Sequence, residues 1–163
     1  MKLYHYITKS RKPNLNFWEH LYAGKIKEYV GNDIWNAYKK ISIIRNPWDH
    51  ALSQYLWVKK YNFKGGEHDF EKYLQTSYVN LFPFYFIAGE FVINEMIKFE
   101  SLKNNTYSLL ARLNINKSLE LPETKNKVRD KKKYQNFYTQ TTSNILLKKN
   151  RIIINQFNYN FDE

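Results

Sequence analysis

The sequence predicts an α/β fold with a mainly parallel sheet flanked by helices. A short β-branched run at 40–44 leads directly into a helical pattern, and an alternating run at 91–99 does the same. Strands that alternate with helices are typical of parallel sheets. The 163 residues are 43% hydrophobic and 18% aromatic, enough for one core. We therefore expect a single domain over residues 1–163.

The first half of the chain supplies the central strand and its helix. Apolar residues at helical spacing predict a helix over 17–30, and Gly31 is a typical C-terminal stop. Residues 40–44, KISII, are short and β-branched, as in a buried strand. Asn46 is a favoured N-cap, and the proline after it suits the first helical position. A helix is therefore expected over 47–60.

The second half of the chain repeats the alternation. Asp69 is expected to cap a short helix. The elements expected there are a helix at 69–76, a strand within 91–99, a helix at about 102–112, a polar segment at 114–133 and a helix at about 139–154.

The net charge of +11 predicts an anionic partner. Alternatively, an AT-rich coding sequence would produce the same excess of Lys together with Asn, Ile and Tyr. The absence of cysteine excludes disulfides and thiolate metal sites, and four scattered histidines give no reason to expect a metal. No apolar run is long enough to span a membrane, and no signal peptide is recognisable, so a cytoplasmic location is expected.

A small-anion site is predicted where the first strand ends. Arg45 follows the strand and precedes a helix N-terminus, where unpaired backbone N–H groups and the helix dipole attract anions. The Arg side chain offers a planar fork for phosphate, and Ser53 lies about two turns into the helix. In the alternative interpretation, Arg45 simply pairs with Asp49, and Ser53 is a surface residue of the helix.

The stretch IIRNPWDHALSQY resembles the 3′-phosphate-binding motif of sulfotransferases that use 3′-phosphoadenosine 5′-phosphosulfate, especially the carbohydrate-type branch. The positions that match are Arg45, Asn46, Pro47, Ser53 and Tyr55. In that family the Arg and Ser bind the 3′-phosphate of the sulfuryl donor. The resemblance therefore implies that Arg45 and Ser53 bind this nucleotide.

The resemblance extends over about residues 18–161. HLYAGKIKEYVGNDIWNAYKKISII is similar to the family's His-containing segment, FVINEMIKFESL to a later strand and Glu-x-Leu turn, and LPETKNKVRDKKKYQNFYT to a late loop. The resemblance implies that His20 is the catalytic base and that Arg129 helps to close the loop over the nucleotide. Alternatively, His20 packs or caps locally, and the basic run around Arg129 is solvated.

One family feature has no counterpart in this sequence. Relatives cradle the 5′-phosphosulfate with a strand and a Lys-x-Gly-Thr loop similar to a P-loop, whereas the first glycine here is Gly24. We therefore expect a sulfotransferase-like, P-loop-related domain that lacks its first strand and loop. The gap would reflect N-terminal truncation, degeneration, or completion by self-association or by a partner chain.

We weigh three functions at this point and rank the third last. The resemblance implies transfer of a sulfuryl group from 3′-phosphoadenosine 5′-phosphosulfate to a hydroxyl of a glycan or similar acceptor, without a metal. The alternative is a non-catalytic nucleotide- or anion-binding remnant of the same fold. A nucleic-acid binder is not expected, because no recognised nucleic-acid motif is present.

Overall fold

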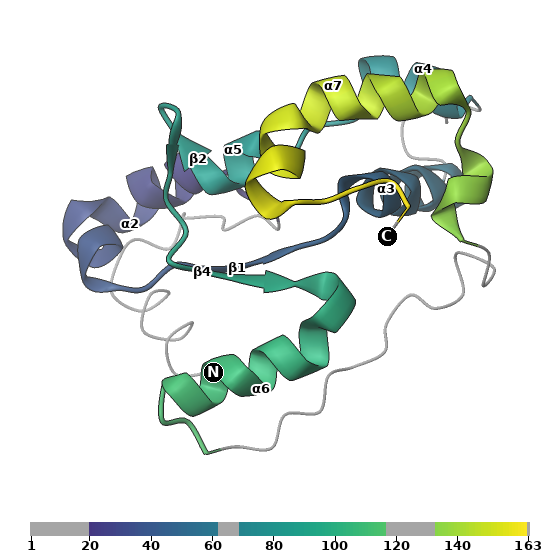
Figure 1. Ribbon diagram of the computed structural model, residues 1–163. Coiled ribbons are helices and arrows are strands. Elements are labelled where there is room, and N and C mark those ends of the chain that lie inside the picture. Colours follow the sequence, from purple (N-terminus) through teal and green to yellow (C-terminus); the bar gives the residue numbers. More distant parts are fainter. Residues whose placement is uncertain (1–19, 62–68, 117–132, 163) are drawn as a thin grey trace. The chain divides into compact units, whose positions relative to one another are not determined.

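Strand β1 (Ile41–Ile44) and strand β4 (Glu95–Lys98) form a parallel pair in the computed structural model, which describes residues 20–61, 69–116 and 133–162 (Figure 1). The register pairs Ile41 with Glu95 and Ile44 with Lys98. The described residues therefore have an α/β fold, mostly helical, with a small parallel sheet of two strands. The chain divides into two compact units.

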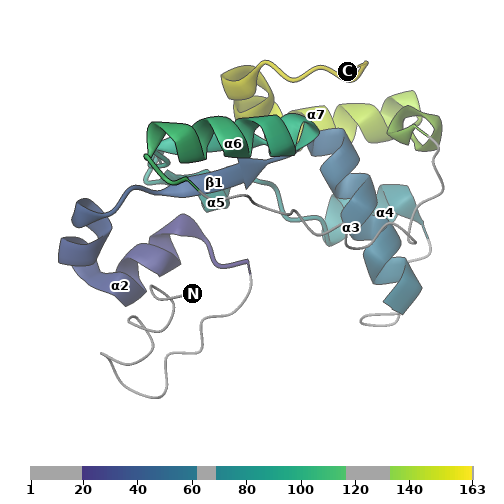
Figure 2. The same cartoon turned by 90° about the horizontal axis from the view of Figure 1, so that it is seen from below.

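The larger unit comprises residues 41–82 and 95–163 and contains the parallel sheet. Helix α3 (Pro47–Tyr61) follows β1, and η1 (Phe99–Ser101) with α6 (Leu102–Arg112) follows β4. Helix α6 packs against β4, and the long helix α7 packs against both α3 and α4 (Figures 1 and 2). The side chains that are completely buried in this unit's core include Ile44, Ala51, Leu52, Leu74, Leu146 and Ile153.

Capping residues fix where the helices of this unit begin. The Asp69 carboxylate accepts the N–H of Glu71 at 2.8 Å and caps α4 (Phe70–Thr76), as the sequence predicts. Thr139 and Thr142 form a reciprocal capping box at the start of α7 (Gln140–Phe157). The 3-10 helix η2 (Tyr134–Phe137) comes just before it. The predicted helices at 47–60, 69–76, 102–112 and 139–154 are thus confirmed, α7 continuing three residues further.

The smaller unit comprises residues 1–40 and 83–94, of which 20–40 and 83–94 are described. Its long helix, α2 (Ala23–Ala37), differs from the predicted helix at 17–30. Residues 17–19 lie outside the described part of the chain, and Tyr22 is an extended N-cap (φ −68°, ψ 150°), so α2 begins at Ala23. Gly31 has φ +79° and kinks the helix, but the helix resumes and reaches Ala37. The predicted helical stop at Gly31 is therefore confirmed for the first segment of α2, and the second segment, which reaches Ala37, was not predicted.

A hairpin in the smaller unit was not predicted. Strands β2 (Phe86–Ile87) and β3 (Glu90–Phe91) pair antiparallel, after the short helix α5 (Phe82–Tyr85). The two turn residues, Ala88 and Gly89, have φ of +50° and +86°, as tight hairpin turns of the mirror-image type require. The strand predicted within 91–99 is therefore shorter than expected, because Phe91 belongs to the hairpin and β4 begins only at Glu95.

Candidate functional site

The candidate site lies at the carboxyl ends of the two parallel strands, in the larger unit. Because the register pairs Ile44 with Lys98, the residues after β1 lie beside those after β4. Arg45 meets Phe99, with the guanidinium carbon 4.7 Å from the ring centre. The backbone N–H of Asn46 donates to the Glu100 carboxylate at 2.6 Å. In open α/β sheets, this edge is the one where ligands bind.

Arg45 is bound to Asp49. Its Nε and Nη2 each lie 2.6 Å from one carboxylate oxygen of Asp49, one turn into α3. The two side chains are 24% and 16% exposed, so the pair is partly shielded from water. This pairing is what the alternative interpretation of Arg45 predicts. Phosphate could reach the same nitrogen atoms only if Asp49 moved away from them.

The backbone donors at the start of α3 are also engaged. The Asn46 N–H is taken by Glu100, and the Trp48 N–H donates to the Asn46 side-chain oxygen at 3.1 Å. The expectation of unpaired N–H groups at this helix N-terminus was therefore wrong for these two residues. A carboxylate from the loop after β4 fills the position expected for an anion, and the second Glu100 oxygen accepts the Tyr159 hydroxyl at 3.2 Å.

Asn46 ties the strand tip to the C-terminal segment. Its side-chain NH₂ donates to the Tyr134 hydroxyl at 3.1 Å and to the Asn160 carbonyl at 3.0 Å. The Tyr134 hydroxyl in turn donates to the Phe161 carbonyl at 2.7 Å. Asn46 is only 3% exposed, so these bonds satisfy a buried amide. The sequence indicated only the capping role, because these partners are distant in sequence.

The other predicted site residues are placed as follows. Ser53 is half-buried on α3, one turn beyond Asp49. His20 is exposed and belongs to the smaller unit, immediately before α2. Arg129 lies outside the described residues. The larger unit thus contains Arg45, at the end of β1, and Ser53, on α3, whereas His20 belongs to the smaller unit.

Two tyrosines in the described residues have strongly raised pKa values. Burial raises the pKa of Tyr85, in the smaller unit, to about 12. Burial also raises the pKa of Tyr138, in the larger unit, and the nearby Tyr78 and Asp49 add to the effect. The Tyr138 hydroxyl donates to the Trp48 carbonyl at 2.7 Å, so it acts as a neutral donor that fixes the first turn of α3.

Comparisons with known proteins add no relative: no family model, curated protein or solved structure matches the chain. The described residues contain no cluster of three or more His, Asp or Glu side chains that could hold a metal ion. Among the helices of that same part of the chain, none has the length and apolarity needed to cross a bilayer.

Proposed function

We propose that this protein binds 3′-phosphoadenosine 5′-phosphosulfate at the tip of β1 and transfers its sulfuryl group to a hydroxyl of a carbohydrate-type acceptor. The observation that carries the proposal is the position of Arg45. It is a half-buried cation at the carboxyl end of a parallel strand, followed at once by a 15-residue helix with Ser53 on its second turn. This arrangement accompanies the sequence resemblance described above.

In the proposed complex, Arg45 and Ser53 hold the 3′-phosphate, and Arg129 helps to close the site, as the resemblance implies. The phosphate takes the place of the Asp49 carboxylate on the guanidinium, because both ligands use the same fork of N–H donors. Asp49 then either turns to solvent or accepts another donor. The exchange leaves the guanidinium paired with an anion throughout, so the partly shielded Arg45 charge never lacks a partner.

The proposed transfer is an in-line displacement at sulfur. The acceptor oxygen forms a bond to sulfur while the bond between sulfur and the bridging phosphate oxygen breaks, releasing 3′,5′-diphosphoadenosine. His20 takes the hydroxyl proton, which is the role that the sequence resemblance implies for it. Arg45 and Ser53 fix the donor by its 3′-phosphate and so orient the sulfur toward the acceptor.

A second candidate function is nucleotide binding without transfer. The observation that favours it is that Arg45 and Ser53, the two described residues expected to bind the 3′-phosphate, both lie in the larger unit, whereas His20 does not. A transfer assay separates the two functions. Wild-type protein that turns over the donor, with loss of turnover in His20→Gln, supports the transferase. Tight diphosphate binding without turnover favours the binding function.

Calorimetric titration tests the nucleotide site itself. We expect 3′,5′-diphosphoadenosine to bind more tightly than 5′-AMP, and Arg45→Ala to raise the Kd for the diphosphate by roughly 10- to 100-fold, as loss of a charged hydrogen-bond donor does. Arg112→Ala is the matched control, because Arg112 also pairs with a carboxylate, Glu95 at 2.9 Å, but lies away from β1's tip on α6. Equal losses in the two variants would contradict the assignment.

A further inference from the structure

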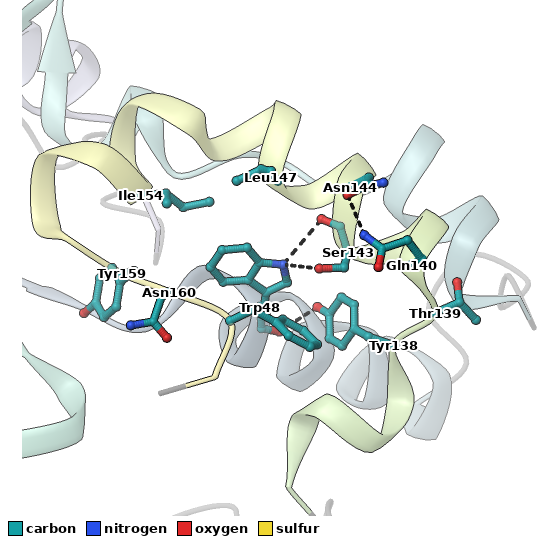
Figure 3. A pocket seen from close by; sticks show the side chains of 11 residues that line it. Trp48, Tyr138, Thr139, Gln140, Ser143, Asn144, Leu147, Ile154, Tyr159 and Asn160 are labelled. Carbon is teal, nitrogen blue, oxygen red and sulfur yellow. Dashed lines mark hydrogen bonds between the residues drawn. The ribbon is translucent and has the colours of Figure 1, made fainter.

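A hollow of about 520 Å³ opens in the larger unit between α7 and the C-terminal segment, above Trp48 of α3 (Figure 3). Its volume lies within the range of roughly 300–1,000 Å³ that small-molecule sites occupy. The hollow is separate from the groups that contact Arg45, because neither Arg45 nor Asp49 lines it. Its lining is partly aromatic and partly amide, and each part indicates what it can bind.

The aromatic groups of the hollow have their polar ends bonded within the protein. The Trp48 indole N–H donates to the Ser143 hydroxyl at 3.1 Å, and the Tyr138 hydroxyl donates to the Trp48 carbonyl. Tyr138 and Phe161 pack edge to face, with ring centres 5.6 Å apart, and both are only half-buried. The lining therefore offers hydrocarbon ring surface to a ligand, without competition from the rings' own polar atoms.

The amide groups of the hollow retain both donors and acceptors. Gln140 donates from Nε2 to Asn144 Oδ1 at 3.0 Å, which leaves the Gln140 oxygen and the Asn144 NH₂ available. Asn160 uses its side-chain oxygen to accept the Asp162 N–H at 3.0 Å, so an N–H of its NH₂ also remains. All three side chains are exposed at the rim. A mixed set of this kind suits a hydroxyl group, which donates and accepts at once.

Charge narrows the class of ligand. Among the described residues that line the hollow, none is Lys, Arg, Asp or Glu. A phosphate or carboxylate would lose its hydration there without gaining a counter-ion, which is costly. For a ring that carries hydroxyl groups and has apolar C–H faces, the loss of hydration is less costly. Its hydroxyls can form hydrogen bonds with the amides, and its faces can pack on the aromatic rings.

From this lining we propose that the hollow binds an uncharged sugar ring. The proposal does not depend on the nucleotide site, because the two sets of residues differ. A sugar bound here would be held by Asn144 and Gln140 on one side and would pack on Phe161 and Tyr138 on the other. The hollow would serve as a glycan-binding site on the larger unit, whether or not the protein transfers sulfuryl groups.

The test is NMR titration of the full ¹⁵N-labelled chain with methyl glucoside, methyl galactoside and methyl N-acetylglucosaminide. We expect at least one glycoside to bind with a millimolar Kd and to shift the Trp48 indole and Asn144 amide signals. Asn144→Ala should raise that Kd at least about fivefold, the loss of one hydrogen bond. The matched control is Asn155→Ala, an exposed amide on α7 that does not line the hollow.

Several outcomes would overturn the proposal. One is that no glycoside shifts any signal, and another is that Asn155→Ala loses as much glycoside affinity as Asn144→Ala. A third is that methyl glucuronide binds more tightly than methyl glucoside. A fourth is that the neutral peptide N-acetyl-phenylalanine methylamide binds more tightly than every glycoside. Thermal unfolding monitored by circular dichroism verifies that each variant folds. Titration of the wild type with 3′,5′-diphosphoadenosine is a separate readout, so a failure of the nucleotide site is distinguishable from a failure of the sugar site.

Discussion

At the scale of single residues, Arg45 is held in place by two side chains of the larger unit. The Asp49 carboxylate binds the guanidinium, and the Phe99 ring lies 4.7 Å from its central carbon. These contacts keep the side chain at the end of β1, where a flexible Arg would otherwise point into water. If a phosphate binds here, Asp49 competes with it directly, because both are anions that bind the same N–H donors of the Arg45 guanidinium.

Asp49→Asn tests this competition. We expect the substitution to lower the Kd for 3′,5′-diphosphoadenosine by about two- to fivefold, because it removes the negative charge that competes with the phosphate for the guanidinium. Asn keeps the size of the side chain and one acceptor oxygen, so the position of Arg45 should be preserved. Calorimetric titration measures the change. Weaker binding would mean that Asp49 holds the cation for its ligand and does not compete with it.

Tyr85 provides a prediction for alkaline pH. The pKa of Tyr85 is raised from 10.0 to about 12 in the folded state by burial. Between these two values the unfolded chain releases the proton while the folded chain keeps it, so the free energy of unfolding falls as pH rises. We expect that fall to be smaller in Tyr85→Phe. Urea unfolding at pH 8, 10 and 11 measures it, and equal losses in both proteins would contradict a buried, neutral Tyr85.

At the level of the elements, Asn150 explains the kink in α7. Its backbone departs from helical geometry (φ −115°, ψ 19°), and its side chain is 2% exposed. The side-chain oxygen accepts the Leu81 N–H at 3.1 Å, and the NH₂ donates to the Tyr78 hydroxyl at 3.3 Å. A polar residue inside the core thus fixes the segment after α4 against the long helix.

Asn150→Ala should therefore lower the free energy of unfolding by about 1–3 kcal/mol, because the buried Leu81 N–H loses its acceptor. Urea denaturation measures this change. Asn155→Ala, an exposed position on the same helix, is the control and should change stability by less than about 0.5 kcal/mol. Similar losses at the two positions would contradict a stabilising role for the Asn150 hydrogen bonds.

Elements with strong local signals could be predicted from the sequence. Local residues are enough to predict three of them, which are the β-branched run of β1, the Asn-Pro start of α3 and the Asp69 cap of α4. The β2–β3 hairpin could not be predicted, because its turn uses Ala88 at φ +50°, where glycine or asparagine is the usual residue. The start of α2 at Ala23 could not be predicted either, because its N-cap is Tyr22, which makes no side-chain capping bond and is not a usual N-cap residue.

The candidate site could be predicted only in its local part. The position of Arg45 after a strand and before a helix follows from neighbouring residues, and so does its i to i+4 relation with Asp49. The role of Glu100 does not, because its contact with Asn46 spans 54 residues and arises from the register of β1 with β4. The hollow above Trp48 likewise combines segments that lie about 90 residues apart in the chain.

For the whole molecule, the net charge of +11 complicates every binding experiment with an anion. A chain this basic attracts any polyanion through long-range electrostatics, and such attraction weakens as salt rises. Tighter binding of a diphosphate than of a monophosphate therefore has two explanations, a built 3′-phosphate site or charge alone. Only ligands of equal charge separate the two.

The most direct measurement is a calorimetric comparison of 3′,5′-diphosphoadenosine with its isomer 2′,5′-diphosphoadenosine at physiological salt. The two nucleotides carry the same charge and differ only in the position of one phosphate. A site built from Arg45 and Ser53 should bind the 3′ isomer at least about tenfold more tightly, and Arg45→Ala should abolish the difference. Equal affinities in the wild type would contradict the account and reduce the interaction to general electrostatic attraction.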